Sequence, residues 1–207
     1  MQLEKLINKH KIIAILRNVP PEKVENYIKA VYDGGIRLIE IALNTPDAFD
    51  QIKLARRLYN GKLTVGAGTV ITIQLAQEAM DAGAQFLLSP CTNAEVLQYC
   101  RKNAIDILPG VMTPGDVDTC LKYGVKTLKL FPAADLPKNY IKSLSGPFSD
   151  ASYVAVGGVG PDNIKEFFDR GFVGAGIGSN LIPQKFIDEN SWDEARTFVA
   201  DLVERTK

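Results

Sequence analysis

Eight short apolar runs recur along the chain, about 20 to 25 residues apart, and helical patterns fill the stretches between them. The runs are rich in Ile, Val and Leu, which is typical of strands buried on both faces of a parallel sheet. They cover residues 11–16, 36–43, 62–68, 84–90, 104–110, 125–131, 152–158 and 171–179. Because parallel strands need long crossover connections, this alternation favours the α/β class.

The stretches between the runs carry helix boundaries. Residues 20–35 begin with two prolines and end with two glycines, and the triplets DAG, KYG and DRG mark the ends of three later helices. Further helical patterns cover residues 1–11, 45–60, 92–103, 160–171 and 192–206.

Eight strand–helix units without a linker, in 207 residues, predict a single domain over residues 1–207 that closes into a (β/α)8 TIM barrel with an N-terminal helix. The alternative is a doubly wound open sheet. It is disfavoured because the chain has eight units and no nucleotide-binding glycine turn after its first run.

Composition narrows the function. The 24 Lys and Arg balance the 24 Asp and Glu, so nothing indicates a nucleic-acid or membrane-surface partner. The three cysteines form no CxxC pair, and we see no signal peptide or membrane-spanning run, so we expect a cytoplasmic protein. His10 is the only histidine, which removes the usual zinc and iron ligand sets, and we expect neither a metal nor a cofactor.

In a barrel of this class the active site lies at the C-terminal ends of the strands. Polar or glycine residues stand at or near the end of each run: Arg17, Glu40, Asn44, Thr69, Ser89, Thr113, Lys129, Gly157, Gly158, Gly178 and Ser179. Glu40 and Lys129 are unusual among them, because a charged group is rarely placed within an apolar strand.

Alternate residues of a strand share a face. Glu40 shares one face of its run with Ile36, Leu38 and Ala42. Lys129 shares one face of its run with Val125, Thr127 and Phe131. We expect both faces to point into the barrel, where the amine and the carboxylate would meet in an enclosed site.

This pair predicts Schiff-base chemistry. A desolvated lysine has a lowered pKa and a free amine that can attack a carbonyl. A buried carboxylate with a raised pKa can move protons through the carbinolamine, imine and enamine stages. Cleavage of a carbon–carbon bond beside a carbonyl follows, with Lys129 as nucleophile and Glu40 as acid and base. The alternative is a buried structural ion pair.

Two glycine-rich stretches, residues 154–163 and 174–181, follow the seventh and eighth runs, where barrels often bind phosphate. We expect a phosphate site made by Gly157, Gly158, Gly178 and Ser179. The alternative is that these glycines serve tight turns alone. A third stretch, VGAGTV at residues 65–70, indicates a close backbone approach that presents Thr69.

The chain resembles the class I 2-keto-3-deoxy-6-phosphogluconate aldolase family, which includes 2-keto-4-hydroxyglutarate aldolases and 6-phosphogalactonate counterparts. The resemblance runs from residue 11 to residue 183 and rests on six motifs in the family's order: GGIRLIEIALNTP, VGAGTV, LPGVMTP, LKLFPA, GGVGPDN and GIGS. It implies a homotrimer of barrels with pyruvate and a phosphorylated keto acid as ligands.

By this resemblance, Lys129 is the Schiff-base lysine and Glu40 the acid and base. Arg17 and Thr69 lie by the carboxylate end of the substrate. The phosphate site is matched by Gly157, Gly158 and Ser179. The rest of the substrate site is assigned to Asn44, Pro90, Phe131 and Val156.

Two departures concern the substrate. Many gluconate-type members have Arg where this chain has Asn44 and Thr where it has Val156, and both differences resemble the galactonate branch. The sequence predicts a lyase that cleaves a 2-keto-3-deoxy-6-phospho sugar acid, gluconate or galactonate, to pyruvate and glyceraldehyde 3-phosphate, with 4-hydroxy-2-oxoglutarate as a further candidate. The alternatives are a sugar-phosphate isomerase or epimerase on the same barrel and a non-catalytic sugar-phosphate-binding protein.

Overall fold

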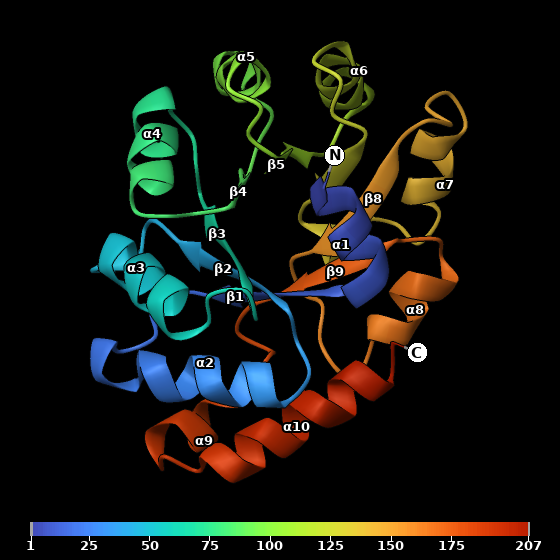
Figure 1. Ribbon diagram of the computed structural model, residues 1–207. Helices are drawn as coiled ribbons and strands as arrows, with labels where there is room; N and C mark the ends of the chain where they lie inside the picture. Colours follow the sequence, from blue (N-terminus) through green and yellow to red (C-terminus); the bar gives the residue numbers. More distant parts are fainter. Residues whose placement is uncertain (1, 207) are drawn as a thin grey trace.

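The strands follow the predicted apolar runs, and each begins within one of them. The computed structural model describes residues 2–206 (Figure 1). Its strands are β1 (Ile12–Leu16), β2 (Leu38–Ala42), β3 (Thr64–Gly68), β4 (Phe86–Leu88), β5 (Ile107–Leu108), β6 (Gly110–Val111), β7 (Thr127–Leu130), β8 (Ser152–Val156) and β9 (Gly174–Ile177).

The helices occupy the stretches between the strands. They are α1 (Gln2–His10), α2 (Val24–Asp33), α3 (Ala48–Leu58), α4 (Ile73–Asp81), α5 (Ala94–Lys102), α6 (Pro114–Lys122), α7 (Tyr140–Ser145), α8 (Ile164–Asp169), α9 (Gln184–Asp188) and α10 (Trp192–Glu204), with 3-10 turns at Pro21–Lys23 and Ala133–Asp135. Side-chain caps begin several of them: Thr72 caps α4, Asn93 caps α5, and Thr113 with Asp116 forms a capping box on α6.

The strands are arranged as a ring of parallel neighbours, in the order β5-β4-β3-β2-β1-β9-β8-β7-β6, so the first strand pairs with the last. The fifth predicted run appears as two short strands, because Pro109 between them has no N–H to donate. β5 pairs with β4, and β6 pairs with β7. The predicted eight-unit barrel with an N-terminal helix is therefore confirmed, with helices around the outside of the strands (Figure 1).

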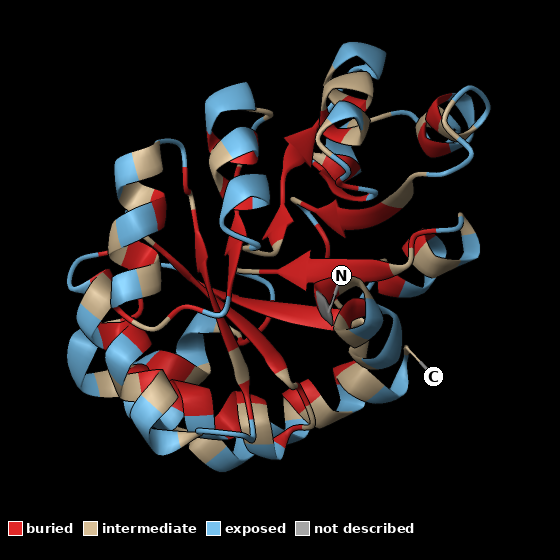
Figure 2. Cartoon of the chain, turned by 45° about the horizontal axis from the view of Figure 1, so that its top comes forward, coloured by how far each residue is buried: buried red, intermediate tan, exposed pale blue. Residues whose placement is uncertain are grey.

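Two apolar clusters hold the barrel together. The larger one lies between the strands and the surrounding helices, and the smaller one fills the inside of the barrel. Figure 2 shows the buried strands and the exposed outer faces of the helices. Ile36 and Val125 belong to the outer cluster, so the expectation that they face inward is wrong. Both precede the strands that begin at Leu38 and Thr127, and the alternation of faces holds only within a strand.

The strand register arranges the inward-facing residues in layers of four, contributed by alternate strands, as in TIM barrels. The lowest layer is Leu38, Phe86, Thr127 and Gly174. The next layer is Ile13, Gly66, Leu108 and Val154. Above it lie Glu40, Leu88, Lys129 and Gly176. The layer at the C-terminal ends of the strands is Ile15, Gly68, Gly110 and Val156.

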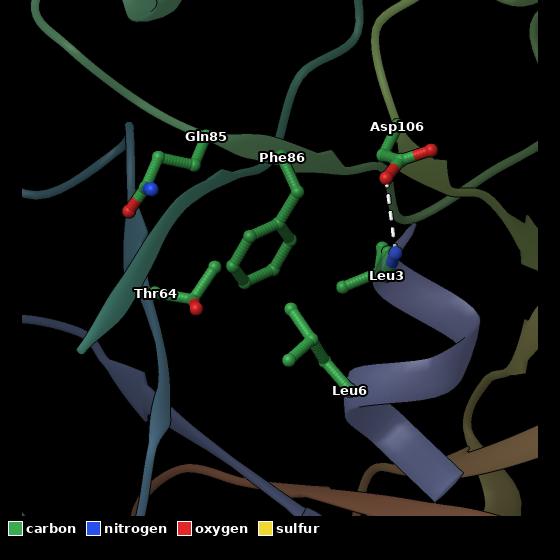
Figure 3. A pocket seen from close by; sticks show the side chains of 6 residues that line it. All are labelled: Leu3, Leu6, Thr64, Gln85, Phe86 and Asp106. Atoms are coloured by element: carbon green, nitrogen blue, oxygen red, sulfur yellow. Dashed lines mark hydrogen bonds between the residues drawn. The ribbon is translucent and has the colours of Figure 1, made fainter. Parts of the chain in front are cut away.

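Helix α1 covers the N-terminal end of the barrel. Its Leu3 and Ile7 belong to the inner cluster, and Ile7 packs where Gly174 lacks a side chain. The Leu3 N–H donates to Asp106 Oδ2 at 3.0 Å (Figure 3). A cavity of about 150 Å³ remains beside the helix, lined by Leu3, Leu6, Thr64, Gln85, Phe86 and Asp106. With this end covered, the charged layer is approached from the C-terminal end of the barrel.

Candidate active site

Glu40 and Lys129 both point into the barrel. Glu40 lies on β2 and Lys129 on β7, and their exposed fractions are 1% and 5%. The residues beside them in sequence, Ile39, Ile41 and Leu128, belong to the outer cluster. The predicted alternation therefore holds for both strands, and it brings a carboxylate and an amine into the same enclosed space.

The register also sets the two groups at the same height on opposite walls. The height of a residue can be followed from strand to strand along the paired residues. Starting at Glu40 and passing through Gly66 and Phe86, these steps end at Val125, before β7. Followed in the other direction around the ring, through Ile15, the paired residues end at Ala133, after β7. Lys129 lies midway between these two end points, so its side chain starts level with Glu40 across the barrel.

The two charged groups face each other without direct contact. Among residues 2–206, Glu40 and Lys129 form no ion pair within 4.0 Å. Glu40 Oε2 is buried and has no hydrogen-bond partner in this part of the chain. Buried polar atoms in proteins are almost always paired, so this oxygen is available to a ligand atom or a water. A structural ion pair would have occupied it.

Burial shifts the ionisation of both groups toward their neutral forms. Desolvation lowers the pKa of Lys129, and the nearby Glu40 carboxylate opposes this effect without cancelling it. Desolvation likewise raises the pKa of Glu40, opposed by the positive charges of Lys129 and Arg17. An amine that loses its proton more readily and a carboxyl that keeps its proton longer are suited to nucleophilic attack and proton transfer.

The end of β3 makes room for the Glu40 carboxylate. A Cβ added at Gly68 would overlap Glu40 Oε1, so a larger residue there would have to displace the carboxylate. The next residue, Thr69, has a φ of 63°, which a β-branched side chain rarely adopts. Its Oγ1 donates to Asn44 Oδ1 at 3.3 Å. The predicted close backbone approach is present at Gly68, and its partner is Glu40.

The walls near Lys129 come from two other loops. The Phe131 ring is 37% exposed, and its centroid lies 4.9 Å from Lys129 Nζ. Gly110 packs against the backbone of Pro90, where a Cβ would overlap the carbonyl. The next residue, Cys91, is an exposed free thiol. It lies close enough to Lys129 to raise the pKa of the lysine electrostatically, against the larger effect of burial.

A cavity of about 390 Å³ opens at the C-terminal end of the barrel, beside the charged layer. It is lined by Ile15, Arg17, Asn18, Phe131, Val156, Gly157, Gly158, Val159, Gly176, Gly178, Ser179 and Asn180. Arg17 is the only cationic side chain among these lining residues, and it acts electrostatically on both Glu40 and Lys129. The cavity is large enough for a small phosphorylated ligand.

One wall of this cavity consists of backbone donors. Among the described residues, the N–H groups of Gly157, Gly158, Ser179 and Asn180 have no protein acceptor. Gly157 and Gly158 have φ values of 92° and 70°, so both adopt the left-handed conformation that glycine allows. Successive free N–H groups at strand ends form a concave site that attracts anions.

The structure brings most of the predicted site residues together, some at the cavity and some below it. Seven of them line the cavity: Arg17, Phe131, Val156, Gly157, Gly158, Gly178 and Ser179. Glu40 and Lys129 lie in the layer beneath. Asn44, Thr69 and Pro90 are not among the cavity-lining residues and occupy the loops after β2, β3 and β4.

Sequence reasoning missed the two asparagines among the lining residues, Asn18 and Asn180. Each directly follows a residue that was assigned to the site, Arg17 or Ser179, and the loop position was the available signal. The need for glycine at position 68 was also missed in part, because the residue that approaches it lies on another strand.

Several absences hold within residues 2–206. No group of three or more His, Cys, Asp and Glu side chains there is placed to hold a metal ion. None of the helices in that range has the length and apolar character needed to cross a membrane.

Comparisons with known proteins point to one enzyme family. The family model described as KDPG and KHG aldolase matches residues 3–198. A 2-dehydro-3-deoxy-6-phosphogalactonate aldolase of Escherichia coli K12 is 33% identical over 189 residues, covering 91% of this chain and 92% of the relative.

Solved structures agree with this match. The native structure of a KDPGal protein superposes with a TM-score of 0.84 at 33% identity, covering 94% of this chain and 95% of the other. The KDPG aldolase of Legionella pneumophila, with pyruvate captured as a covalent carbinolamine, superposes with a TM-score of 0.85 at 27% identity, covering 98% and 97%.

Proposed function

Since the chain belongs to the KDPG and KHG aldolase family and is a class I aldolase, a carbon–carbon lyase that releases pyruvate and an aldehyde, we propose that Lys129 and Glu40 carry out its reaction. The observation that carries this proposal is their placement: two buried groups at one height on opposite walls, without a direct ion pair. Lys129 is the nucleophile, and Glu40 is the acid and base.

The reaction begins at the Lys129 amine, whose neutral form is favoured because burial lowers its pKa. Its nitrogen adds to C2 of the keto acid to form a carbinolamine. The carboxylic acid of Glu40 protonates the carbinolamine hydroxyl, which leaves as water and gives a protonated imine. The imine draws the C3–C4 bonding electrons toward nitrogen as that bond breaks. The aldehyde leaves, and the pyruvate fragment remains on Lys129 as an enamine.

Glu40, now a carboxylate, also moves the proton of the cleavage step. Its carboxylate accepts the proton of the C4 hydroxyl as the C3–C4 bond breaks, and its carboxylic acid returns a proton to C3 of the enamine. Water then hydrolyses the imine, which releases pyruvate and the free lysine. The raised pKa of Glu40 supports this role, since a carboxyl that titrates nearer neutral pH can both accept and donate.

The substrate spans from the charged layer into the cavity. We assign Arg17 and Thr69 to its carboxylate end. The phosphate end is assigned to Gly157, Gly158, Gly178 and Ser179, whose positions around the cavity support an anion site. The middle of the substrate contacts Asn44, Pro90, Phe131 and Val156.

The substrate class is a 2-keto-3-deoxy-6-phospho sugar acid that yields glyceraldehyde 3-phosphate. Val156 lines the cavity with an apolar side chain, and this favours acceptance of the galacto epimer at least as readily as the gluco epimer. The E. coli relative is named for the galactonate substrate, which supports the same choice. 4-Hydroxy-2-oxoglutarate, which has no phosphate, is a second candidate substrate.

Trapping of the imine tests the assignment. The protein is treated with pyruvate and borohydride, and its peptides are analysed by mass spectrometry. We expect a reduced pyruvate adduct on Lys129 and none on Lys126 or Lys138. An adduct on either of those lysines would contradict the assignment. Absence of any adduct would favour an isomerase or a binding protein on the same barrel.

We also propose a homotrimer located in the cytoplasm. The exposed apolar side chains of Ile71 and Met112 support an interface between copies of the chain. The free thiols of Cys91, Cys100 and Cys120 support a reducing compartment. Light scattering on the purified protein measures the first property, and fractionation of the source cells measures the second.

A further inference from the structure

The loop of residues 157–160, which carries part of the proposed phosphate site, has all its carbonyls engaged by protein donors. Gly157 O accepts from the Ala134 N–H at 3.1 Å, and Gly160 O accepts from the Ile164 N–H at 2.9 Å. The two carbonyls between them, Gly158 O and Val159 O, accept from side-chain amides. An anion that approaches this loop therefore meets N–H groups rather than carbonyl oxygens.

Asn163 supplies one of these amides. It stands at the N-cap of α8, where an asparagine normally accepts hydrogen bonds from its own helix, yet it makes no such cap bond. Its Nδ2 instead donates to Gly158 O at 2.9 Å, and its Oδ1 accepts from the Gly160 N–H at 2.9 Å. Both halves of the amide are turned back onto the loop.

Asn180 supplies the other amide, from the neighbouring loop after β9. Its Nδ2 donates to Val159 O at 3.2 Å. Asn180 also packs closely against Gly160, because a Cβ added at Gly160 would lie 3.0 Å from Asn180 Cβ. Asn180 therefore joins the loop that carries Gly158 to the loop that carries Ser179, and these two loops supply the backbone donors of the cavity wall.

We propose that Asn163 and Asn180 are positioning residues, which hold the carbonyls of loop 157–160 away from the ligand and thereby give the site its preference for a phosphorylated substrate. The inference rests on the proposed function, because it takes the cavity to hold the phosphate end. Neither side chain needs to touch the phosphate. Without the amide donors, Gly158 O and Val159 O are free to rotate toward the cavity, where they repel an anion.

The main test uses Asn163→Ala, which removes the donor to Gly158 O and the acceptor of the Gly160 N–H without adding a charge. We expect KM for the 6-phosphorylated substrate and the inhibition constant of inorganic phosphate to rise together by about tenfold or more, with kcat changed little. Deuterium exchange into the methyl group of pyruvate should be unchanged, because this half-reaction uses Lys129 and Glu40 without a phosphate.

Asn180→Ala is the second variant. It removes the single bond to Val159 from an exposed position, so the protein should fold. We expect a rise in KM of several-fold, again confined to phosphorylated ligands. Asn93→Ala serves as the control, since the Asn93 side chain also donates to a loop carbonyl, Ile71 O, but lies outside the cavity.

Three outcomes are informative. An equal loss on phosphorylated substrate and on pyruvate exchange would show that the asparagines support the barrel only, and would overturn the inference. Unchanged phosphate affinity in both variants would overturn it as well. If wild-type protein is not inhibited by inorganic phosphate and prefers no phosphorylated substrate, the assignment of the phosphate end fails first, and the inference fails with it.

Discussion

Water is withdrawn from both Glu40 and Lys129 by the barrel, and the consequence differs because one group is neutral when protonated and the other when deprotonated. The pKa of Glu40 rises and that of Lys129 falls. Each group therefore spends more of its time neutral than it would at the surface. For a Schiff-base enzyme this is the useful state of both, because the amine must attack and the carboxyl must exchange protons.

Replacement of Glu40 by Gln separates catalysis from stability. We expect Glu40→Gln to lower kcat by roughly a hundredfold or more, the usual effect of losing a general acid and base, while the protein stays folded. Wild-type stability should decrease as pH rises above the ordinary glutamate pKa of about 4.5, because the folded chain holds the proton more tightly than the unfolded chain. Glutamine does not titrate.

Thermal unfolding at two pH values checks this linkage. The difference in melting temperature between Glu40→Gln and wild type should favour the variant more at pH 7 than at pH 4. The reverse trend would mean that Glu40 is held as an anion by Lys129, and it would support the structural ion pair instead.

We expect Val156 to determine the choice between C4 epimers. A substrate hydroxyl that faces this valine is desolvated without a partner, at a cost of about 1–3 kcal/mol, or about ten- to a hundredfold in specificity. We expect Val156→Thr to shift kcat/KM toward the gluco epimer of the 6-phospho acid. The two purified epimers are compared on wild type and variant. A wild-type preference for the gluco epimer above about a hundredfold would show that Val156 does not set the choice.

Strand β3 depends on its glycines for the space that its neighbours use. Gly66 faces the Phe86 ring, and Gly68 faces the Glu40 carboxylate. We expect Gly68→Ala to displace that carboxylate and to lower kcat by roughly a hundredfold, as small misplacements of catalytic groups do. Trapping of pyruvate on Lys129 should still occur, since the lysine lies on another strand.

Gly115→Ala is the matched control for this prediction. Its added Cβ would meet only Thr113 Oγ1, at an ordinary contact distance of 3.8 Å, so its kinetics should equal those of wild type. Full activity of Gly68→Ala would show that the carboxylate has another place to go.

Periodicity predicted the strands and helices well because each strand is buried on both faces and each helix has clear ends. The fifth run was predicted as one strand, but Pro109 divides it into β5 and β6. The missing N–H of a proline interrupts a strand only where a neighbouring strand would accept from it, and the sequence does not show which neighbour that is. Ile36 and Val125 were wrongly assigned to the inner faces. The sequence does not show that the strands begin only after these residues, at Leu38 and Thr127. Asn180 was missed because its partner, Val159, lies on another loop.

For the whole molecule, the two ends of the barrel carry different tasks. Ile7 of α1 is fully buried at the N-terminal end. We expect Ile7→Ala to lower the free energy of unfolding by about 2–5 kcal/mol, the usual cost of such a truncation in a core. KM and kcat of the folded protein should be unchanged, because two further layers of side chains separate the helix from the charged layer.

Denaturant unfolding and steady-state kinetics on the same preparation check this prediction. Lys5→Ala, on the exposed side of the same helix, is the control and should change neither quantity. A loss of activity without a loss of stability would show that helix α1 shapes the active site directly.

The break at Pro109 has a consequence for how the barrel could be taken apart. β5 pairs only with β4, and β6 only with β7. Among the described residues, the two halves of the ring therefore meet there without a strand ladder, through the chain itself and through single bonds such as that from the Lys129 N–H to Pro109 O at 2.9 Å. At the opposite junction they meet through the β1–β9 ladder. A chain cut after Pro109 would give two pieces, one carrying Glu40 and the other Lys129. Neither piece would be an enzyme, and activity would report their reassembly, as in a split reporter protein.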